Sequence, residues 1–436
     1  MMLLKNPVLK NASWIIACNI VQSVLGLLVG VFTARYLGPS NYGTINYAAS
    51  ITAFAAPIMY LGLNATLVQE IVSQPEQEGK ILGTSLVMNF GSSLLCIVGI
   101  FAFVSIANRS ETETIIVCTL YSLLLIFQAF EILQYWFQAK LKSKYTSITM
   151  FITYLLVSAY KIFLLATEKS IYWFAVSNAL DYFLISLILL IIYRKISTQK
   201  LSFSLQLGKT LFSKSKYYIL SGMMVTIFAN TDRIMLKLMV DESATGYYAA
   251  AVTCASITSF FFSAIIDSAR PAIFEGKQLG IHVFEKRIKL LYAIVIFMAL
   301  LQSVGITIFA KLIVNILYGA QYSFSIDILR ILVWYTTFSY IGAIRDIWIL
   351  SEGKQRILLI INLFGAVTNI ILNSLLIPLW GGNGAAVASL ITQIFTNVIL
   401  GFIIKPLRKN NYLMCQSLNP RILLDAVTKR QKDSNA

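Results

Sequence analysis

The sequence is poor in charge. Only 12% of its 436 residues are charged, while 58% are hydrophobic. A soluble domain carries about 25% charged residues, so this chain has too few to cover a water-soluble globule. The composition excludes such a globule and indicates a polytopic α-helical membrane protein.

The residues that build metal and catalytic sites are also scarce. His282 is the only histidine, which excludes a histidine-based metal site or triad. The five cysteines are scattered without a CxxC pair, which argues against a disulfide framework or a zinc site. The glycine-rich run 381–384 lacks the Lys and Ser/Thr of a phosphate-binding loop. We therefore expect no enzyme activity, no metal, no cofactor and no use of ATP by this chain.

Acidic residues are outnumbered, with 19 Asp and Glu against 35 Lys and Arg and a formal net charge of +16. Such a charge can mark a nucleic-acid-binding protein. In a membrane protein, however, Lys and Arg collect in the cytoplasmic loops, where they set orientation and face anionic lipid. We interpret the charge as a topological signal and expect no nucleic-acid partner.

The chain lacks the alternating segments of about 10 residues that mark an outer-membrane barrel. Its apolar blocks are instead 20–28 residues long, enough for helices that cross a hydrocarbon layer of about 30 Å. We predict twelve spans, at residues 13–34, 44–68, 81–107, 114–137, 145–166, 171–193, 217–239, 247–269, 290–317, 326–350, 357–377 and 385–404.

The distribution of Lys and Arg predicts the orientation. With the N-terminus in the cytoplasm, the inner segments hold 26 of these residues, the outer loops together with the outer span ends hold six, and three lie deeper within spans. This bias favours an even number of spans with both termini in the cytoplasm.

The basic stretch 194–216 separates two series of apolar blocks. It holds six Lys and Arg and no Asp or Glu. We predict a six-helix bundle at 1–193, a cytoplasmic connector at 194–216, a second six-helix bundle at 217–404 and a cytoplasmic tail at 405–436. The run YLGPSNYG after the first span and DESATG after the seventh occupy matching positions. They indicate parallel repeats with a site at their interface.

Charged residues inside the predicted spans need a reason, because each costs about 2.5–3.5 kcal/mol at the bilayer centre. Arg35 and Arg270 stand at span ends, and those within spans are Glu131, Lys161, Asp181, Asp232, Arg233, Asp267, Arg345 and Asp346. Most continue stripes of Ser, Asn, Gln and Tyr at helical spacing.

Two interpretations of these stripes remain open. In one, the polar residues hold helices together and the charges pair internally, for example Asp232 with Lys161. In the other, the stripes line a water-filled cavity for a polar substrate. For Lys161, Arg233 and Arg345 we favour the cavity, because ionisable groups within the membrane usually mark transport paths.

Four motifs resemble those of a known family. They are ARYLGPSNYG at 34–43, LGLNA at 61–65, SEGK at 351–354 and GGNGAA at 381–386. In this order they are similar to the bacterial Wzx-type O-antigen flippases, which move polysaccharide repeat units. These belong to the polysaccharide transport branch of the multidrug/oligosaccharidyl-lipid/polysaccharide (MOP) exporter superfamily.

The resemblance implies an all-α polytopic protein of about twelve transmembrane helices in two six-helix bundles, a MATE-like arrangement. It also implies transport of undecaprenyl-diphosphate-linked oligosaccharide from the cytoplasmic to the periplasmic leaflet of the bacterial inner membrane. Membrane lipids, a polysaccharide polymerase and chain-length proteins are the further partners that it suggests.

A cationic cavity for the diphosphate follows from this interpretation, because Arg and Lys bind phosphate oxygens and Arg does so with two donors at once. The candidate diphosphate contacts are Arg35, Lys161, Arg233, Arg270 and Arg345. The candidate coupling-ion sites are Glu131, Asp181 and Asp267.

Three alternatives are weighed against the flippase. A cation-coupled multidrug exporter of the same superfamily would have an acidic cavity, whereas the four charges in the outer half sum to +2; the more acidic inner half leaves this open. A peptidoglycan-precursor flippase is expected to carry two further spans. A glycan polymerase or ligase is expected to have a long periplasmic loop, and the predicted outer loops are all short.

Overall fold

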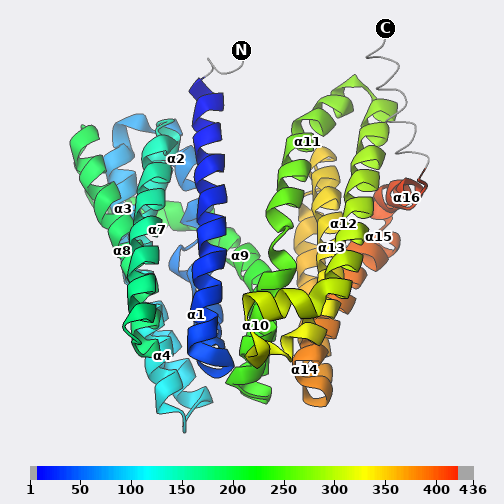
Figure 1. The fold of residues 1–436 in the computed structure, drawn as a ribbon. Helices are drawn as coiled ribbons and strands as arrows, with labels where there is room; N and C mark the ends of the chain where they lie inside the picture. Colours follow the sequence, from blue (N-terminus) through cyan, green and yellow to red (C-terminus); the bar gives the residue numbers. More distant parts are fainter. Residues whose placement is uncertain (1–6, 421–436) are drawn as a thin grey trace. The chain divides into compact units, whose positions relative to one another are not determined.

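The computed structural model describes residues 7–420, which form helices and no strand. Figure 1 shows these helices. Their bounds are α1 Pro7–Met59, α2 Leu67–Ser73, α3 Glu78–Ala107, α4 Thr112–Ser122, α5 Leu124–Gln128, α6 Leu133–Ala139, α7 Ser143–Ala166, α8 Ile171–Ile196, α9 Leu205–Met239, α10 Glu242–Ser256, α11 Ser259–Leu279, α12 Ile281–Leu317, α13 Ser325–Ser351, α14 Arg356–Ile394, α15 Leu400–Ile403 and α16 Arg408–Ser417. Short 3₁₀ turns lie between several of them, and a π-helical segment, Phe395–Ile399, joins α14 to α15.

The chain divides into two compact units. Unit 1 is Met1–Gly246 and contains α1 to α9, while unit 2 is Tyr247–Ala436 and contains α11 to α16. Helix α10 crosses the boundary between them. The predicted division into bundles at 1–193 and 217–404 stays a prediction. Part of the predicted tail, 421–436, lies outside the described residues, and α16 forms within the part that is described.

Two glycines break long helices into pairs. Gly38 in α1 has φ 72° and ψ 172°, and Gly381 in α14 has φ 54° and ψ −128°. Positive φ carries little penalty only for a residue without Cβ, so each kink falls where the sequence provides a glycine. The two kinks fall between the first and second predicted spans and between the eleventh and twelfth.

Seven helical segments among the described residues are long and apolar enough to cross a membrane, or eight if α10 and α11, bent by 45°, form one span. Two of the seven, Val21–Met59 and Arg356–Ile403, contain the glycine kinks and so each hold two predicted spans. The two predicted spans that remain lie in α9 and α13, which carry more charge. Every predicted span thus lies largely in helix, although the second, fourth and eighth contain turns or breaks.

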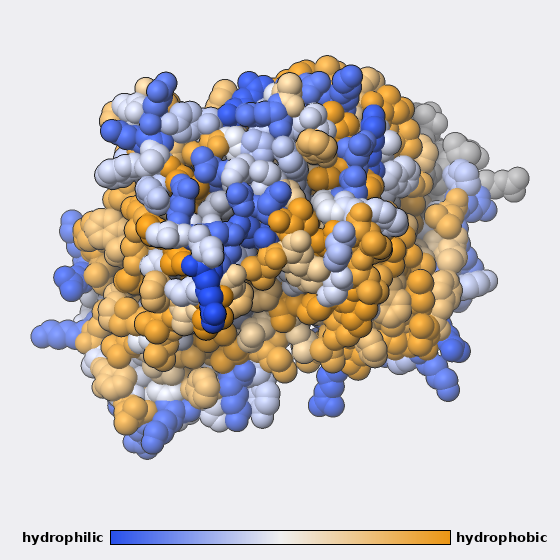
Figure 2. Space-filling model, turned by 90° about the horizontal axis from the view of Figure 1, so that it is seen from below, coloured by the Kyte–Doolittle hydropathy of each residue, from blue (hydrophilic) through white to orange (hydrophobic). Residues whose placement is uncertain are grey.

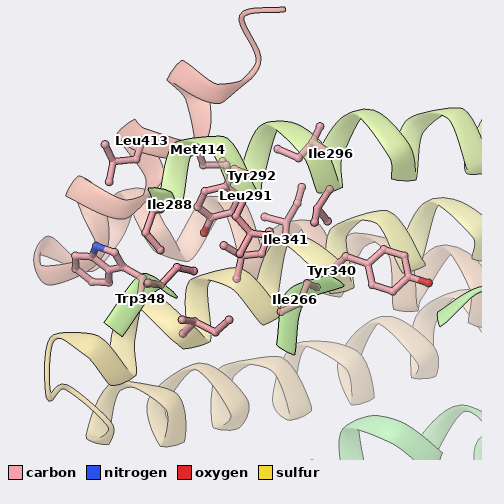
Figure 3. Close-up of a cluster of buried hydrophobic side chains, with 14 of the residues drawn as sticks. Ile266, Ile288, Leu291, Tyr292, Ile296, Tyr340, Ile341, Trp348, Leu413 and Met414 are labelled. Atoms are coloured by element: carbon pink, nitrogen blue, oxygen red, sulfur yellow. The ribbon is translucent and has the colours of Figure 1, made fainter. Parts of the chain in front are cut away.

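The core of unit 2 is built by α11, α12, α13 and α16. Figure 3 shows Leu413 and Met414 beside Ile288, Leu291 and Tyr292, all of them buried. The rings of Phe262 and Tyr340 stack in the same cluster at a centroid distance of 4.1 Å. Apolar side chains of α16 therefore hold this short helix against the rest of unit 2.

In the described part of unit 1, one apolar cluster surrounds Tyr47, Leu125 and Phe174 and another surrounds Trp136 and Tyr193. Large apolar side chains are also abundant on the surface of both units; Leu95 is 75% exposed and Leu301 68%. Hydrophobic residues likewise cover much of the face shown in Figure 2. Such a surface suits hydrocarbon rather than water.

The basic stretch 194–216 is packed against α3 of unit 1. The Gln199 side chain donates to Pro75 O over 2.9 Å and accepts from Gly79 N over 3.0 Å. Ser204 N donates to the Thr84 hydroxyl over 3.1 Å. Gly83 lies so close that a Cβ there would come within 2.6 Å of Ser202 O. The stretch is therefore held close to α3, where Gly79 and Gly83 allow the two backbones to approach.

Candidate functional site

Unit 1 contains a cavity of about 210 Å³ among helices α1, α4, α7 and α8. Most of its lining side chains are polar or aromatic, although the helices around it are strongly apolar. Two of the predicted site residues, Lys161 and Asp181, line it. The structure thus brings a candidate phosphate contact and a candidate ion-coupling carboxylate into one space.

Helices α7 and α8 supply the charged wall. Tyr154, Ser158 and Lys161 follow one another at steps of four and three along α7, which places them on one face. Asn178 and Asp181 stand three residues apart on α8 for the same reason. Lys161 Nζ donates to Asn178 Oδ1 over 3.2 Å. Among the described residues, Asp181 Oδ1 is buried without a hydrogen-bond partner.

Helix α1 supplies the opposite wall, and its small residues leave the space open. A Cβ added at Gly26 would lie 2.5 Å from the Tyr154 hydroxyl, whereas a Cβ at Gly30 would meet nothing within 4 Å. Thr33 lines the same wall, and its buried hydroxyl has no partner in the described part of the chain. A side chain at position 30, which also lines the cavity, would therefore enter open space.

The other predicted residues of unit 1 lie outside the lining of this cavity. Glu131 sits in a 3₁₀ turn, Ala129–Ile132, and accepts a hydrogen bond from the Tyr60 hydroxyl over 2.8 Å. Arg233 Nη1 reaches Asn230 Oδ1 over 3.4 Å, and its buried Nε has no hydrogen-bond partner within residues 7–420. Arg35 is exposed on α1.

Unit 2 holds the remaining predicted residues, and its two predicted cations, Arg270 and Arg345, are both paired. Arg270 lies 3.0 Å from Asp267, and both are largely exposed on α11. Arg345 is buried, and its guanidinium binds Asp346 over 2.7 Å. It also donates to Thr396 O over 2.8 Å and to Asn397 Oδ1 over 2.7 Å. Both acceptors lie in the π-helical segment.

A second ionic network in unit 1 was not predicted. Lys237, with a side chain only 2% exposed, lies 2.7 Å from Glu111 and 2.8 Å from Glu242. Burial raises the pKa of Glu111, but hydrogen bonds from Lys237 and Thr114 outweigh it and leave the pKa below its ordinary value of 4.5. The signal available in the sequence was that Lys237, Glu111 and Glu242 all lie in or next to predicted outer loops.

A comparable carboxylate lies at the end of α13 in unit 2. Glu352 pairs with Lys277 and with Lys354. Burial alone would raise the pKa of Glu352. The hydrogen bonds from the two lysines lower it by more, so the pKa lies below its ordinary value. These pairs are structural, because they join the end of one helix to its neighbours.

No group of three or more His, Cys, Asp or Glu side chains in the described part of the chain is placed to hold a metal ion. The lining of the cavity supplies hydrogen-bonding groups, aromatic faces and one charged side chain of each sign. It suits the binding of a polar group within a membrane protein.

The family model described as polysaccharide biosynthesis protein matches residues 8–277. No curated protein matches the sequence.

Several solved structures share the fold. A lipid II flippase, MurJ, in an inward closed conformation matches with a TM-score of 0.73 and 16% identity, over 94% of this chain and 92% of that one. An inward-facing multidrug resistance MATE family transporter of the MOP superfamily matches with a TM-score of 0.63 and 15% identity, over 89% and 96%. The eukaryotic MATE transporter AtDTX14 matches with a TM-score of 0.57 and 12% identity, over 96% and 100%.

These matches confirm the predicted fold class, a MATE-like polytopic membrane protein built entirely from helices. The family model covers well over half of the sequence. The chain therefore belongs to the polysaccharide biosynthesis protein family, and it has the fold of the MOP-superfamily transporters.

Proposed function

We propose that the protein is a flippase of the bacterial inner membrane. It moves undecaprenyl-diphosphate-linked O-antigen or related polysaccharide repeat units from the cytoplasmic to the periplasmic leaflet by alternating access. Both termini lie in the cytoplasm. Family membership and the fold that it shares with a lipid II flippase support this proposal.

One observation carries the proposal: the helices of unit 1 enclose a cavity that holds Lys161 and Asp181. Ionisable groups within a membrane are costly and usually mark a transport path. A cavity lined with such groups suits a polar substrate, while the lipid tail of that substrate remains in the hydrocarbon.

The predicted diphosphate contacts differ in how many partners they have. Arg270 and Arg345 each bind a carboxylate on their own helix. Arg35 lies exposed on α1. Lys161 is hydrogen-bonded to Asn178, and the Arg233 guanidinium retains an unpartnered buried nitrogen among the described residues. We therefore expect Lys161 and Arg233 to matter most, and we propose Glu131, Asp181 and Asp267 for the coupling ion.

A cation-coupled multidrug exporter is the second candidate function. The fold is shared with MATE transporters, and the cavity includes the carboxylate of Asp181. In this alternative, deletion of the gene sensitises cells to cationic drugs and leaves the surface glycan unchanged.

The test uses a strain that lacks the gene. Under the proposed function, the deletion strain accumulates lipid-linked repeat units that face the cytoplasm and loses its surface glycan. Lys161→Ala and Arg233→Ala each reduce the restored display at least tenfold while the protein remains at its normal level in the membrane. Lys144→Ala, an exposed lysine on the same helix as Lys161, serves as the matched control.

Two results would count against the assignment. Normal display in both Ala variants contradicts the role of these cations. Normal display in the deletion strain itself contradicts the flippase.

A further inference from the structure

The size of the unit 1 cavity limits what it can hold. Its volume is about 210 Å³, below the roughly 300–1,000 Å³ of sites for drug-sized ligands. It is equivalent to about seven waters at roughly 30 Å³ each. One six-membered sugar ring or one small anion fits such a space, whereas an oligosaccharide does not.

The charge of the lining separates these two occupants. Lys161 and Asp181 are the only lining residues of a charged type, one of each sign, so their formal charges cancel. A diphosphate bears several negative charges and is bound where cationic donors are in excess. Here the Asp181 carboxylate would repel it, and would repel the carboxylate of an acidic sugar. Lys161 would in turn repel the ammonium of an amino sugar.

The unpartnered polar atoms indicate that the occupant both donates and accepts hydrogen bonds. Asp181 Oδ1 and the Thr33 hydroxyl are buried without partners in the described part of the chain. Buried polar atoms are rarely left so in native proteins, because each costs about 1–3 kcal/mol. A hydroxyl group of a sugar donates to the carboxylate and accepts from the Lys161 ammonium.

Aromatic rings complete this set. Tyr121, Tyr154 and Phe174 line the cavity together with the amides of Asn46 and Asn178. An aromatic ring offers a flat apolar face, and a tyrosine adds a hydroxyl at its edge. The apolar C–H face of a pyranose packs on such rings while its hydroxyl groups reach the polar atoms.

We infer that this cavity binds one uncharged pyranose ring of the lipid-linked glycan. The inference rests on the proposed function and deepens it. It changes the role of Lys161 from a contact with the diphosphate to a contact with a sugar hydroxyl. The diphosphate then binds cations outside the cavity, such as Arg233, whose buried Nε has no hydrogen-bond partner among the described residues.

Gly30 provides a graded test, since a side chain there enters open space. We would build Gly30→Ala, Gly30→Val and Gly30→Leu and measure flipping in the deletion strain. Transport should fall with side-chain volume, about twofold for Ala and more than tenfold for Leu, at unchanged membrane levels. The same series at Gly99, whose Cβ on α3 also meets nothing within 4 Å and lies outside the cavity, should leave transport unchanged.

The results separate the inference from the function on which it rests. Wild-type transport by Gly30→Leu, in a strain whose deletion abolishes display, overturns the sugar site and leaves the flippase intact. Normal display in the deletion strain overturns both.

Binding is measured on the full chain in lipid nanodiscs, because detergents with sugar head groups would compete. The probes are neutral methyl hexopyranosides in their gluco, galacto, manno and N-acetylgluco forms, together with glucuronate and inorganic diphosphate. A neutral glycoside should raise the melting temperature saturably in the wild type and in Gly99→Leu, and not in Gly30→Leu. No shift with any neutral glycoside, or a diphosphate shift that Gly30→Leu abolishes, overturns the inference.

Discussion

Unit 1 and unit 2 each place a cation within predicted membrane spans, and the surroundings of the two cations differ. Lys161 lines a cavity and is hydrogen-bonded to the amide of Asn178. Arg345 is buried against a carboxylate, a backbone carbonyl and the side chain of Asn397. One cation thus borders empty space, while the guanidinium of the other is surrounded by acceptors.

The contrast shows that a charge within a span is not by itself evidence of a binding site. A guanidinium that binds the carbonyl of a π-helical residue stabilises that irregular backbone, which is a structural role. An ammonium beside unpartnered oxygens in a cavity retains donors for another molecule. The predicted phosphate contact at Arg345 stays a prediction, and the structure offers it a competing role.

Removal of Arg345 should have the largest effect on stability. Arg345→Ala leaves three acceptors without their donor, and the loss of one partner of a buried pair costs about 3–5 kcal/mol. The Asp346 side chain is 43% exposed, so we expect the low end, about 3 kcal/mol. The melting temperature of purified protein and its level in the membrane should both fall, whereas Lys161→Ala should change neither. Equal melting temperatures for Arg345→Ala and wild type would contradict the structural role.

Substitution of one glycine in each unit should change stability by less than removal of Arg345 and should separate the packed site of unit 2 from the open cavity of unit 1. A Cβ at Gly342 of unit 2 would lie 2.5 Å from Asn397 Oδ1, which also accepts a hydrogen bond from Arg345. Gly342→Ala should therefore destabilise the protein by about 1–3 kcal/mol through overpacking. Gly30→Ala enters open space and should stabilise α1 by about 0.5–1 kcal/mol, since it removes a helical glycine. Thermal melting of both variants tests this; the reverse order of stability would show that the cavity is closed and the π-helical segment loosely packed.

The smallest expected effect concerns pH. The pKa of Glu111 in unit 1 and that of Glu352 in unit 2 are both lowered by lysines. A lowered pKa contributes stability that is present above the ordinary value of 4.5 and is lost as the pH falls through the folded-state pKa. The melting temperature should therefore decline as the pH is lowered below about 4.5, and less steeply in Glu111→Gln and Glu352→Gln. Identical pH profiles for wild type and both variants would refute the contribution of these pairs.

The helices could largely be predicted from the sequence, because a long apolar run has few alternatives in a membrane. The kinks at Gly38 and Gly381 fall between predicted spans, where glycine permits positive φ. The breaks inside the fourth predicted span were not foreseen. There the chain forms α4, α5, a 3₁₀ turn at Glu131 and α6 in place of one helix. Such breaks depend on packing between helices, which hydropathy does not report.

The cavity was only partly predictable. Helical spacing identified the polar faces of α7 and α8, and hence Lys161, Asn178 and Asp181 as members of such faces. It did not show which faces meet; Lys161 was suggested as a partner of Asp232 and instead donates to Asn178. It also did not show that glycine on α1 hollows the opposite wall. These facts depend on rotation and spacing of helices, which emerge only from the packed structure.

Helix α9 has a consequence for how the protein is made. The stretch before it is hydrogen-bonded to α3, and Ser215 near its start donates to Leu61 O over 2.7 Å. At its other end, Lys237 pairs with Glu111. Unit 1 therefore lacks one of its helices until the ribosome has synthesised residues up to Gly246. During synthesis the first six predicted spans lie in the membrane before α9 covers the surface that it contacts. A chain that stops within 194–216 therefore yields an incomplete unit 1.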